Sequence, residues 1–381
     1  MGKIRCFYWD DSFKEVTVNI ENKTLAFAYG LIKAHKENDD YPVRIVISCI
    51  NSFIYEFDKA LSIFFNKYLK KPRASVKNSY QLKSIVDNIV VPENYEFVSL
   101  DVVAMYPNLP HYLIKEVLSR KWDLLCNKIL PLTKDEFLEG IQFLLNSTYF
   151  RFNNKYYKQI LGAPIGFCTS PWFGELVMEA LETNSLNKLN SSNAMNNFFI
   201  DNFNNPVFLY KRYVDDCILL VDKDKKSKIL NSFNGFNKYL QFTIEEENIG
   251  KEISFLDLLL IRNDKEKVIT DWFRKKNFSG RYLNFLSHHP ISQKRAIVYC
   301  LVDKSMLLAD KKYHQKNLDL IKQLLLENNY PEYFIDQNIK KRKKLILNKN
   351  NKSIELENTS NNDVKKSHFL FFLFIKMLVM N

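Results

Sequence analysis

The stretch Leu209-Tyr-Lys-Arg-Tyr-Val-Asp-Asp-Cys-Ile-Leu-Leu-Val221 decides how this chain is interpreted. Two apolar, β-favouring runs flank the adjacent acids Asp215 and Asp216, which predicts a hairpin with both carboxylates at its tip. Because Asp tolerates a left-handed backbone, the acidic pair itself is expected to make the reversal. Neighbouring carboxylates repel and raise each other's pKa unless a cation neutralises them. The pair is therefore either a polar turn or a site for divalent cations with oxygen ligands.

The composition narrows the class of protein. The 381 residues can form two or three domains, and 46% hydrophobic with 26% charged residues is typical of a globular protein. A net charge of +12 indicates a polyanionic partner, with a membrane surface as the rival. The six cysteines are scattered without a Cys-x-x-Cys pair, which argues against a zinc knuckle and a disulfide framework and suits a reducing compartment. The apolar run 369–380 is shorter than the roughly 20 residues of a membrane span, so no membrane partner is expected.

A third acid lies upstream of the pair. Residues Phe97 to Val103 predict a buried strand in which Asp101 is the only charge. A lone acid in such a strand is unfavourable unless it is paired, protonated or bound to a metal. The alternative, an N-cap, is weakened because the next predicted helix starts only at about His111.

Two other segments accompany these acids. Lys33, Lys36 and Arg44 cluster near one predicted turn and form either a solvated face or a phosphate clamp. The loop Gln159–Pro171 contains Gly162 and Gly166, which permit close approach of a ligand or another backbone.

The remaining periodicity predicts helices and strands in an α+β order. A helix is predicted from Ser170, as N-cap, to about Glu182, and an Asn- and Ser-rich surface insertion follows at 183–206. Ordered structure is predicted to end at Asn348. Strand, helix, insertion and hairpin in this order predict an antiparallel sheet backed by helices, which brings the three acids to one edge. Further helices are predicted at about 53–70, 80–89, 111–127, 227–240, 292–309 and 315–327.

Three of these segments together resemble reverse transcriptases. Tyr213-Val-Asp-Asp216 resembles the tyrosine-x-Asp-Asp box, Phe97–Tyr106 resembles motif A, and Gln159–Pro171 resembles motif B. Other segments give the chain a closer resemblance to the Penelope-like retroelement group, which is related to telomerase. The segments that carry this closer resemblance, within a match over about 25–310, are 29–36, 43–48, 255–257 and 281–290.

The resemblance implies an α+β, right-hand polymerase fold. Its expected parts are fingers at 1–94, a ferredoxin-like palm at 95–275 with the insertion 183–206, a helical thumb at 276–345, and a disordered or degenerate tail at 346–381. The implied reaction is RNA-directed DNA synthesis, in which a primer 3′-hydroxyl attacks a deoxynucleoside triphosphate. The expected partners are therefore an RNA template, a DNA primer and deoxynucleoside triphosphates.

The resemblance also assigns roles to individual residues. Asp101, Asp215 and Asp216 would be catalytic and, with the backbone carbonyl of Val102, would bind two Mg²⁺ ions, or Mn²⁺ in their place. Tyr106 would lie under the sugar and exclude ribonucleotides. The expected nucleotide-binding residues are Lys33, Arg44, Tyr106, Gln159 and Gly162. The expected nucleic-acid-binding residues are Lys36, Gly166, Tyr213, Arg274, Lys275 and Arg281.

Some residues depart from the family's pattern. Phe167-Cys-Thr follows Gly166 where the family has Ser-Pro-Leu, Ile45 replaces a proline after Arg44, and no GIY-YIG endonuclease segment is found. These departures are interpreted as signs of a truncated or decayed copy. They keep two alternatives open, an RNA-dependent RNA polymerase and an inactive remnant that acts at most as a basic nucleic-acid-binding protein. The basic run Lys340–Lys344 is either a nuclear import signal or a solvated tail, and a nuclear or cytoplasmic location is expected.

Overall fold

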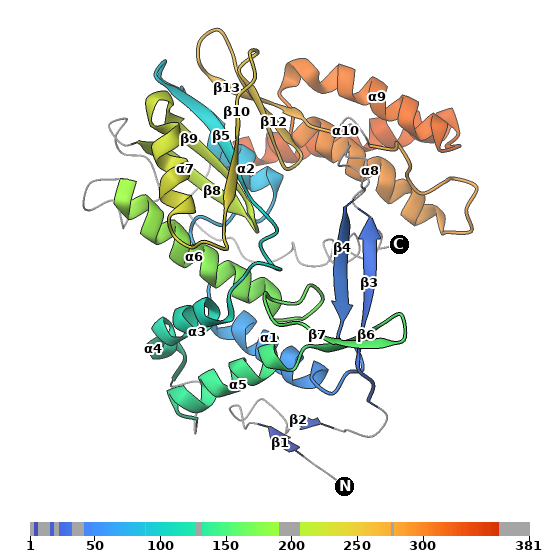
Figure 1. Cartoon of the computed structure of the whole chain (residues 1–381). Helices are drawn as coiled ribbons and strands as arrows, with labels where there is room; N and C mark the ends of the chain where they lie inside the picture. The colour runs from blue at the N-terminus through green and yellow to red at the C-terminus, as the bar shows by residue number, and fades with distance from the viewer. Residues whose placement is uncertain are drawn as a thin grey trace. The chain divides into compact units, whose positions relative to one another are not determined.

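The structure is a computed structural model that describes residues 4–6, 16–18, 23–32, 42–87, 89–126, 132–189, 206–275 and 278–357. The chain divides into two compact units. The first comprises residues 1–278 with 308–310, and the second comprises 279–307 with 311–381 (Figure 1).

A four-stranded antiparallel sheet is the centre of the first unit. Its strand order is β10 (Phe242–Glu246), β5 (Tyr95–Val102), β9 (Asp216–Asp222), β8 (Val207–Tyr213). The helices α6 (Ser170–Leu189) and α7 (Lys226–Asn234) complete the succession β5-α6-β8-β9-α7-β10, a β-α-β-β-α-β arrangement with further elements inserted between β5 and α6.

The two faces of this sheet differ. On one face Leu100, Cys217 and Leu219 are buried in the same core as Phe173 and Leu181 of α6, and Figure 1 shows α6 and α7 on that side. On the other face Phe97 is buried with 1% exposure, whereas Asp101, four residues further along β5, is exposed. The second face therefore opens at the end that carries the acids.

Four further helices contribute buried residues to this core. They are α1 (Tyr55–Tyr68), α3 (His111–Arg120), α4 (Trp122–Leu125) and α5 (Lys134–Asn146). Helix α2 (Ser79–Val86) instead contacts the chain near β13, where Lys83 donates to Thr270 at 2.8 Å. The predicted single helix over 111–127 is thus two helices, because the chain turns at Lys121, whose N–H is bonded to the carbonyls of Val117, Leu118 and Ser119.

A second sheet has the order β4 (Val43–Ser48), β3 (Ala26–Ile32), β6 (Tyr149–Phe152), β7 (Lys155–Lys158). The predicted Asn-Asn hairpin between β6 and β7 is confirmed, since Asn153 and Asn154 have φ of 45° and 58°, the left-handed pair that a tight hairpin requires. A separate two-stranded sheet pairs β1 (Ile4–Cys6) with β2 (Val16–Val18).

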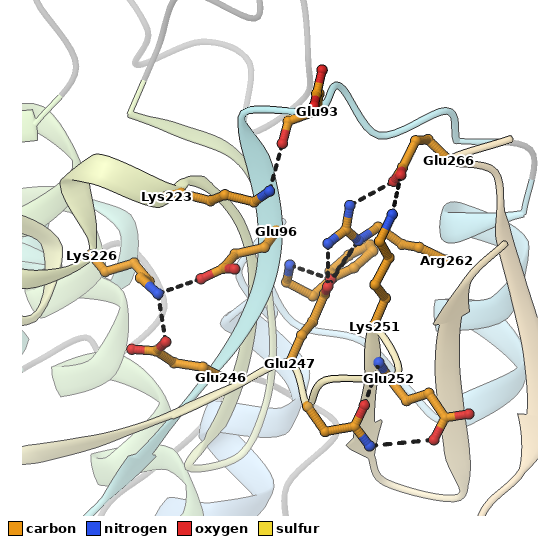
Figure 2. A network of polar contacts seen from close by, with 12 residues as sticks. Glu93, Glu96, Lys223, Lys226, Glu246, Glu247, Lys251, Glu252, Arg262 and Glu266 are labelled. Carbon is orange, nitrogen blue, oxygen red and sulfur yellow. Dashed lines mark hydrogen bonds and ion pairs between the residues drawn. The ribbon is translucent and has the colours of Figure 1, made fainter. Parts of the chain in front are cut away.

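A third sheet is joined to the central one by a buried ion pair, Arg262–Glu247. It consists of β11 (Glu252–Phe255), β12 (Leu258–Arg262) and β13 (Val268–Trp272). Figure 2 shows Arg262 between Glu247 and Glu266, with the Arg262 Nη2–Glu247 Oε2 distance 2.6 Å. Glu247 also accepts a 2.7 Å bond from the backbone N–H of Phe97 in β5. This carboxylate fixes the two sheets in one arrangement.

The second unit is helical. It contains α8 (Ile291–Leu307), α9 (His314–Glu327) and α10 (Glu332–Glu357). Asn328 supports the turn between α9 and α10, because its side-chain amide donates to the carbonyls of Gly280 and Leu324. Arg342 of α10 makes two 2.7 Å bonds to Asp303 of α8.

Three predicted boundaries are wrong. Helix α6 continues past Glu182 to Leu189, since Leu186 and Leu189 extend its buried face and Ser185 bonds to Ser232; residues 183–189 are helical, and 190–205 lie outside the described residues. Helix α7 ends at Asn234 rather than about 240. Helix α10 runs to Glu357, past Asn348 where ordered structure was predicted to end. Among the described helices, none is both long and apolar enough to cross a membrane.

Candidate active site

The acidic hairpin turns on a valine rather than on an aspartate. Strand β8 ends at Tyr213 and β9 begins at Asp216, so Val214 and Asp215 form the turn. The left-handed residue is Val214, with φ of 58°, so the prediction that the acidic pair supplies this conformation is wrong. A β-branched residue in this region is a conformational outlier and is disfavoured by about 1–2 kcal/mol. Other contacts must hold the turn.

Two of the three acids lie side by side on the open face of the sheet. The register pairs Tyr213 with Asp216, Asp216 with Asp101, and Asp101 with Thr243. Residues directly opposite each other in antiparallel strands share a face, with Cα atoms about 5 Å apart. Asp216 and Asp101 therefore project from neighbouring strands in one row, and Asp215 precedes them in the turn.

The charged forms of Asp215 and Asp216 are destabilised in the folded chain. Burial raises the pKa of Asp216, the nearby Asp215 and Asp101 raise it as well, and Lys275 lowers it, with a resulting pKa of about 6. Burial also raises the pKa of Asp215, as does Asp101, whereas Arg44 and Arg212 lower it. Among the described residues no salt bridge neutralises any of the three acids.

The chemistry of these side chains suits a hard divalent cation, because carboxylate oxygens are the ligands that Mg²⁺ prefers. Mutual repulsion of three carboxylates is also what a bound cation would relieve. Within the part of the chain that the structure describes, however, no three His, Cys, Asp or Glu side chains are already gathered into a metal-binding group. The acids are close enough to interact electrostatically and are not preassembled as ligands.

A buried ionic cluster lies on the opposite face of the same hairpin. Arg212 is 0% exposed, and its guanidinium bonds to Glu182 and, at 3.2 and 3.3 Å, to both oxygens of Glu175. Burial would lower the pKa of Arg212, but the carboxylates of Glu182 and Glu175 raise it above its ordinary value. Arg212 Nη1 also donates to the carbonyl of Val214 at 2.7 Å. The cluster thus clamps the left-handed turn from behind.

A cation and a tyrosine approach the acids from other segments. Arg44 of β4 is close enough to lower the pKa of Asp215 and to influence Tyr106. Burial raises the pKa of Tyr106, and together with the nearby Asp215 and Glu175 it brings this pKa to about 12. The structure therefore brings together Arg44, Tyr106 and Asp215, which are far apart in the sequence.

The glycine loop closes tightly around these residues. Gly162 has φ of +83°, and a Cβ on it would lie 2.3 Å from the carbonyl oxygen of Pro107 and 2.6 Å from that of Tyr106. Gly166 has φ of +121°, and a Cβ there would lie 2.3 Å from the carbonyl oxygen of Ile47 in β4. The N–H of Ile47 in turn donates to the carbonyl of Ile165 at 2.7 Å. The glycines allow one loop to join β4 to the segment after β5.

A buried acid anchors the far end of this loop. Asp58 of α1 is 0% exposed and accepts hydrogen bonds from the N–H of Cys168 at 2.6 Å and from the N–H and hydroxyl of Thr169 at 3.0 and 2.6 Å. It thereby satisfies the backbone donors of the two residues directly before α6. The hydroxyl of Ser170, the predicted N-cap, instead donates to the carbonyl of Pro164 at 2.6 Å. The N-cap prediction for Ser170 is wrong.

The other predicted site residues are dispersed. The side chain of Val102 is buried, and Gln159 donates to the carbonyl of Leu161 at 2.8 Å. The guanidinium of Arg274 lies 5.2 Å from the centre of the Trp272 ring. Arg281 is exposed in the second unit. Lys33 and Lys36 lie outside the described residues.

The sequence interpretation missed the residues that support the site. The basic pair Lys211-Arg212 in a mainly apolar strand was a detectable signal, and Glu175 and Glu182 lie seven residues apart, on one face of α6. No local signal marks Asp58, because its partners lie 110 and 111 positions away in the sequence.

Comparisons with known proteins give three results. Residues 281–340 match the family described as the animal helix-turn-helix domain. Among curated proteins, no sequence matches the chain. Among solved structures, the chain is similar to telomerase from Candida albicans in complex with the TWJ fragment of telomeric RNA, with 12% identity and a TM-score of 0.49, covering 81% of this chain and 56% of that one.

Two further solved structures are similar to the chain. For telomerase from Candida tropicalis in complex with the same RNA fragment, the identity is 16%, the TM-score 0.43, and the coverage 81% of this chain and 54% of that one. For the BmCPV RNA-dependent RNA polymerase at the elongation state, the identity is 11%, the TM-score 0.39, and the coverage 79% of this chain and 26% of that one. The chain spans about half the length of the two telomerases, at 54% and 56%.

Proposed function

We propose that this chain is an RNA-directed DNA polymerase of the Penelope-like kind, and that Asp101, Asp215 and Asp216 are its catalytic residues. One observation carries the proposal. The register of β5 and β9 places Asp101 beside Asp216 on an open sheet face, directly after a turn that holds Asp215, and no ion pair neutralises them among the described residues. Uncompensated carboxylates at a partly buried site are expected where a cation or a reacting group is to be bound.

The same three acids, with the carbonyl of Val102, would hold two Mg²⁺ ions, or Mn²⁺ in their place. When bound, such ions activate a hydroxyl nucleophile and neutralise charge on the leaving phosphate oxygens. The hairpin fixes the position of Asp215. Arg212 donates a hydrogen bond to the carbonyl of Val214, the residue before Asp215, and so holds the turn at the end of the sheet. The carboxylate of Asp215 is not needed for this contact.

The surrounding residues would orient the nucleotide. Arg44, whose charge reaches Asp215, would bind the triphosphate, because a guanidinium can form two parallel bonds to phosphate oxygens. We assign the same role to Lys33. Tyr106 is held against α6, since its Cε1 lies 3.3 Å from where a Cβ of Gly174 would be. A ring fixed in this way would exclude a ribose 2′-hydroxyl. Gln159 and Gly162 would line the same pocket.

The template and primer would contact residues around this pocket. Tyr213 shares the row of the acids and is 38% exposed, and Lys275 is exposed and close enough to affect Asp216. We assign fingers to 1–94, the palm to 95–275, and the thumb to 276–345. In the thumb, Arg281 and the animal helix-turn-helix match are compatible with contacts to a duplex, as are Gly166, Lys36 and Arg274 in the first unit.

Primer extension tests the proposal. The substrate is a DNA primer on an RNA template with Mg²⁺, and the proteins are the parent chain, Asp215→Asn, and Asp222→Asn as a control. Asp222 lies at the other end of β9, opposite Tyr95. We expect deoxynucleotide addition by the parent and the control, and none by Asp215→Asn.

Two other outcomes separate the alternatives. Extension with ribonucleotides but not with deoxynucleotides would identify an RNA polymerase. Absence of extension from the parent, with retained binding of the duplex, would identify an inactive remnant. Tyr106→Ala sharpens the assignment, because this variant should incorporate ribonucleotides more readily than the parent; unchanged sugar selection would remove the proposed role of the ring.

A further inference from the structure

One face of the sheet β4-β3-β6-β7 is aromatic and basic. Phe27 lies beside Arg151 of β6, and Arg151 lies opposite Tyr156 of β7. Tyr29 follows Phe27 on the same side of β3, and Leu31 is opposite Arg44 of β4. Since opposed residues share a face, we define the aromatic face as Phe27, Tyr29, Arg44, Tyr149, Arg151 and Tyr156.

The rings of this face are exposed to solvent. Tyr156 is 71% exposed, Phe27 58% and Tyr29 40%, and the rings of Phe27 and Tyr29 stack with centroids 6.5 Å apart. On the opposite face, Ala26, Ala28 and Ile47 are buried in the core of the first unit, whereas Val43 and Ile45 are exposed. A contiguous exposed patch of large rings indicates a binding surface.

The charge of this surface has one sign. None of the four strands contains an acid, and each except β3 contains Arg or Lys. The guanidinium of Arg151 donates to Asn154 in the adjacent turn at 2.6 Å, and Lys158 lies 5.2 Å from the centre of the Tyr149 ring. Cations interleaved with exposed rings complement a chain of phosphates and bases, because bases stack on the rings and phosphates meet the cations.

The aromatic face is continuous with the acidic site through Arg44. Arg44 pairs with Leu31 and lowers the pKa of Asp215. Phe27 lies four residues from Leu31 along β3, which corresponds to about 13 Å at the usual rise of a strand. Two strands across from Phe27, Tyr156 lies about 10 Å further to the side. A strand leaving the acidic site could follow this path over a few nucleotides.

We propose that the aromatic face binds single-stranded nucleic acid, with unpaired bases stacked on Phe27, Tyr29 and Tyr156 and phosphates bound by Arg151. A duplex is disfavoured as the occupant, because its bases are already stacked on each other and are not free to stack on protein rings. That this single strand is the template copied at the acidic site rests on the proposed function. That the aromatic face binds single-stranded nucleic acid does not depend on the proposed function.

Equilibrium binding to the full chain tests this inference. Fluorescence anisotropy is measured with a labelled single-stranded 12-mer RNA and with a blunt duplex of the same length. The variants are Tyr156→Ala, Tyr156→Phe, and Phe152→Ala as the matched control. Phe152 is 50% exposed, but it lies on the opposite face of the same hairpin.

We expect Tyr156→Ala to weaken single-strand binding about 5- to 150-fold, the range for loss of one stacked base. Tyr156→Phe and Phe152→Ala should bind within about twofold of the parent, because the first keeps a ring and the second leaves the aromatic face intact. Blunt-duplex affinity should be unchanged in all of them. Arg151→Ala should reduce the slope of log affinity against log salt by about 0.7.

Equal single-strand affinities for Tyr156→Ala and Phe152→Ala would overturn the inference. So would a change of oligomeric state in Tyr156→Ala, measured by sedimentation, without any change in RNA binding, since the face would then be a contact between copies of the chain. Failure of this inference can be told apart from failure of the proposed function. If the parent extends no primer but Tyr156→Ala loses RNA affinity, the binding role of the aromatic face stands and the polymerase function fails. If the parent extends primers and Tyr156→Ala keeps its RNA affinity, the polymerase function stands and the binding role of the aromatic face fails.

Discussion

Two groups of charged side chains lie on opposite sides of the hairpin β8–β9, and only one group is neutralised by ion pairs. On the helix side, Arg212 is paired with both Glu175 and Glu182, and all three are almost fully buried. On the open side, Asp101, Asp215 and Asp216 face one another with no ion pair among the described residues. A fold can bury charge stably only when it is compensated, so the uncompensated group is the one that structure alone does not explain.

The two groups are physically connected. Arg212 belongs to the compensated cluster and also donates to the carbonyl of Val214, the left-handed residue directly before Asp215. Removing a charge from the helix-side cluster (Arg212, Glu175 or Glu182) should therefore lower the stability of the fold. Removing a charge from the open side (Asp101, Asp215 or Asp216) should impair function without lowering stability.

The largest expected effect is on catalysis. Asp215→Asn should slow primer extension about 1000-fold or more, because several kcal/mol of charge stabilisation at the reacting phosphate would be lost. The metal-free stability of this variant should be equal to or above that of the parent, since one repelling charge is removed. Extension kinetics and thermal unfolding check both expectations. Glu182→Gln is the matched variant from the helix side, and it should lower stability; a loss of stability in Asp215→Asn as large as in Glu182→Gln would break the comparison.

The next effect is on folding. Arg212→Met should lower the free energy of unfolding by about 3–5 kcal/mol, because two buried carboxylates and the Val214 carbonyl lose their partner. Adding Glu175→Leu and Glu182→Leu should recover more than half of this loss, since no unpaired buried charge remains. Urea unfolding of the single and triple variants measures the difference. A triple variant no more stable than Arg212→Met would mean that the cluster acts through specific contacts rather than charge compensation.

The pH dependence of stability provides a smaller effect with a defined sign. The folded pKa of Asp216 is about 6 and its unfolded pKa is about 3.9, so the folded state holds the proton more tightly. This contribution to stability is fully present below about pH 4 and is lost as the pH rises through about 6. Relative to Asp216→Asn, the metal-free parent should lose about 1 kcal/mol between pH 4 and pH 7, after allowance for solvent screening.

Chemical unfolding across this pH range, with both proteins in parallel, checks the expectation. Burial raises the pKa of Glu182 to about 7, but Glu182 titrates in both proteins, so its effect cancels in the difference. A stability difference that is independent of pH would contradict the raised pKa of Asp216.

The smallest effect is expected at the turn. Val214→Gly removes left-handed strain of about 1–2 kcal/mol and adds about 0.5–1 kcal/mol of chain entropy in the unfolded state. The free energy of unfolding should therefore change by less than about 1 kcal/mol. Primer extension should slow by less than tenfold, because Arg212 can still bind the carbonyl of residue 214. A loss above 3 kcal/mol in urea unfolding would show that the valine side chain itself holds the site.

The sequence predicts the parts of this site that depend on local pattern. The apolar runs around Asp215 and Asp216, and the apolar strand that ends near Asp101, indicate their strands through residue type and periodicity alone. The Asn153–Asn154 turn follows from the same kind of local preference.

Contacts between distant residues determine what the sequence could not predict. Val214 takes the left-handed conformation although Asp215 is the better local candidate, because Arg212 holds the Val214 carbonyl. Asp58, more than a hundred residues away in the sequence, binds the N–H groups of Cys168 and Thr169, the two residues directly before α6. The extension of α6 to Leu189 depends on Ser185 meeting Ser232, which the Asn- and Ser-rich composition conceals.

The most direct test of the central claim is the binding of Mn²⁺ by calorimetry in the absence of nucleotide. The proteins are the parent chain, Asp215→Asn, and Glu182→Gln. If the open-side acids are uncompensated because they hold a cation, the parent and Glu182→Gln should bind Mn²⁺ with similar affinity, and Asp215→Asn should bind it at least tenfold more weakly. Equal binding by the parent and Asp215→Asn would contradict the claim that these acids form the metal site.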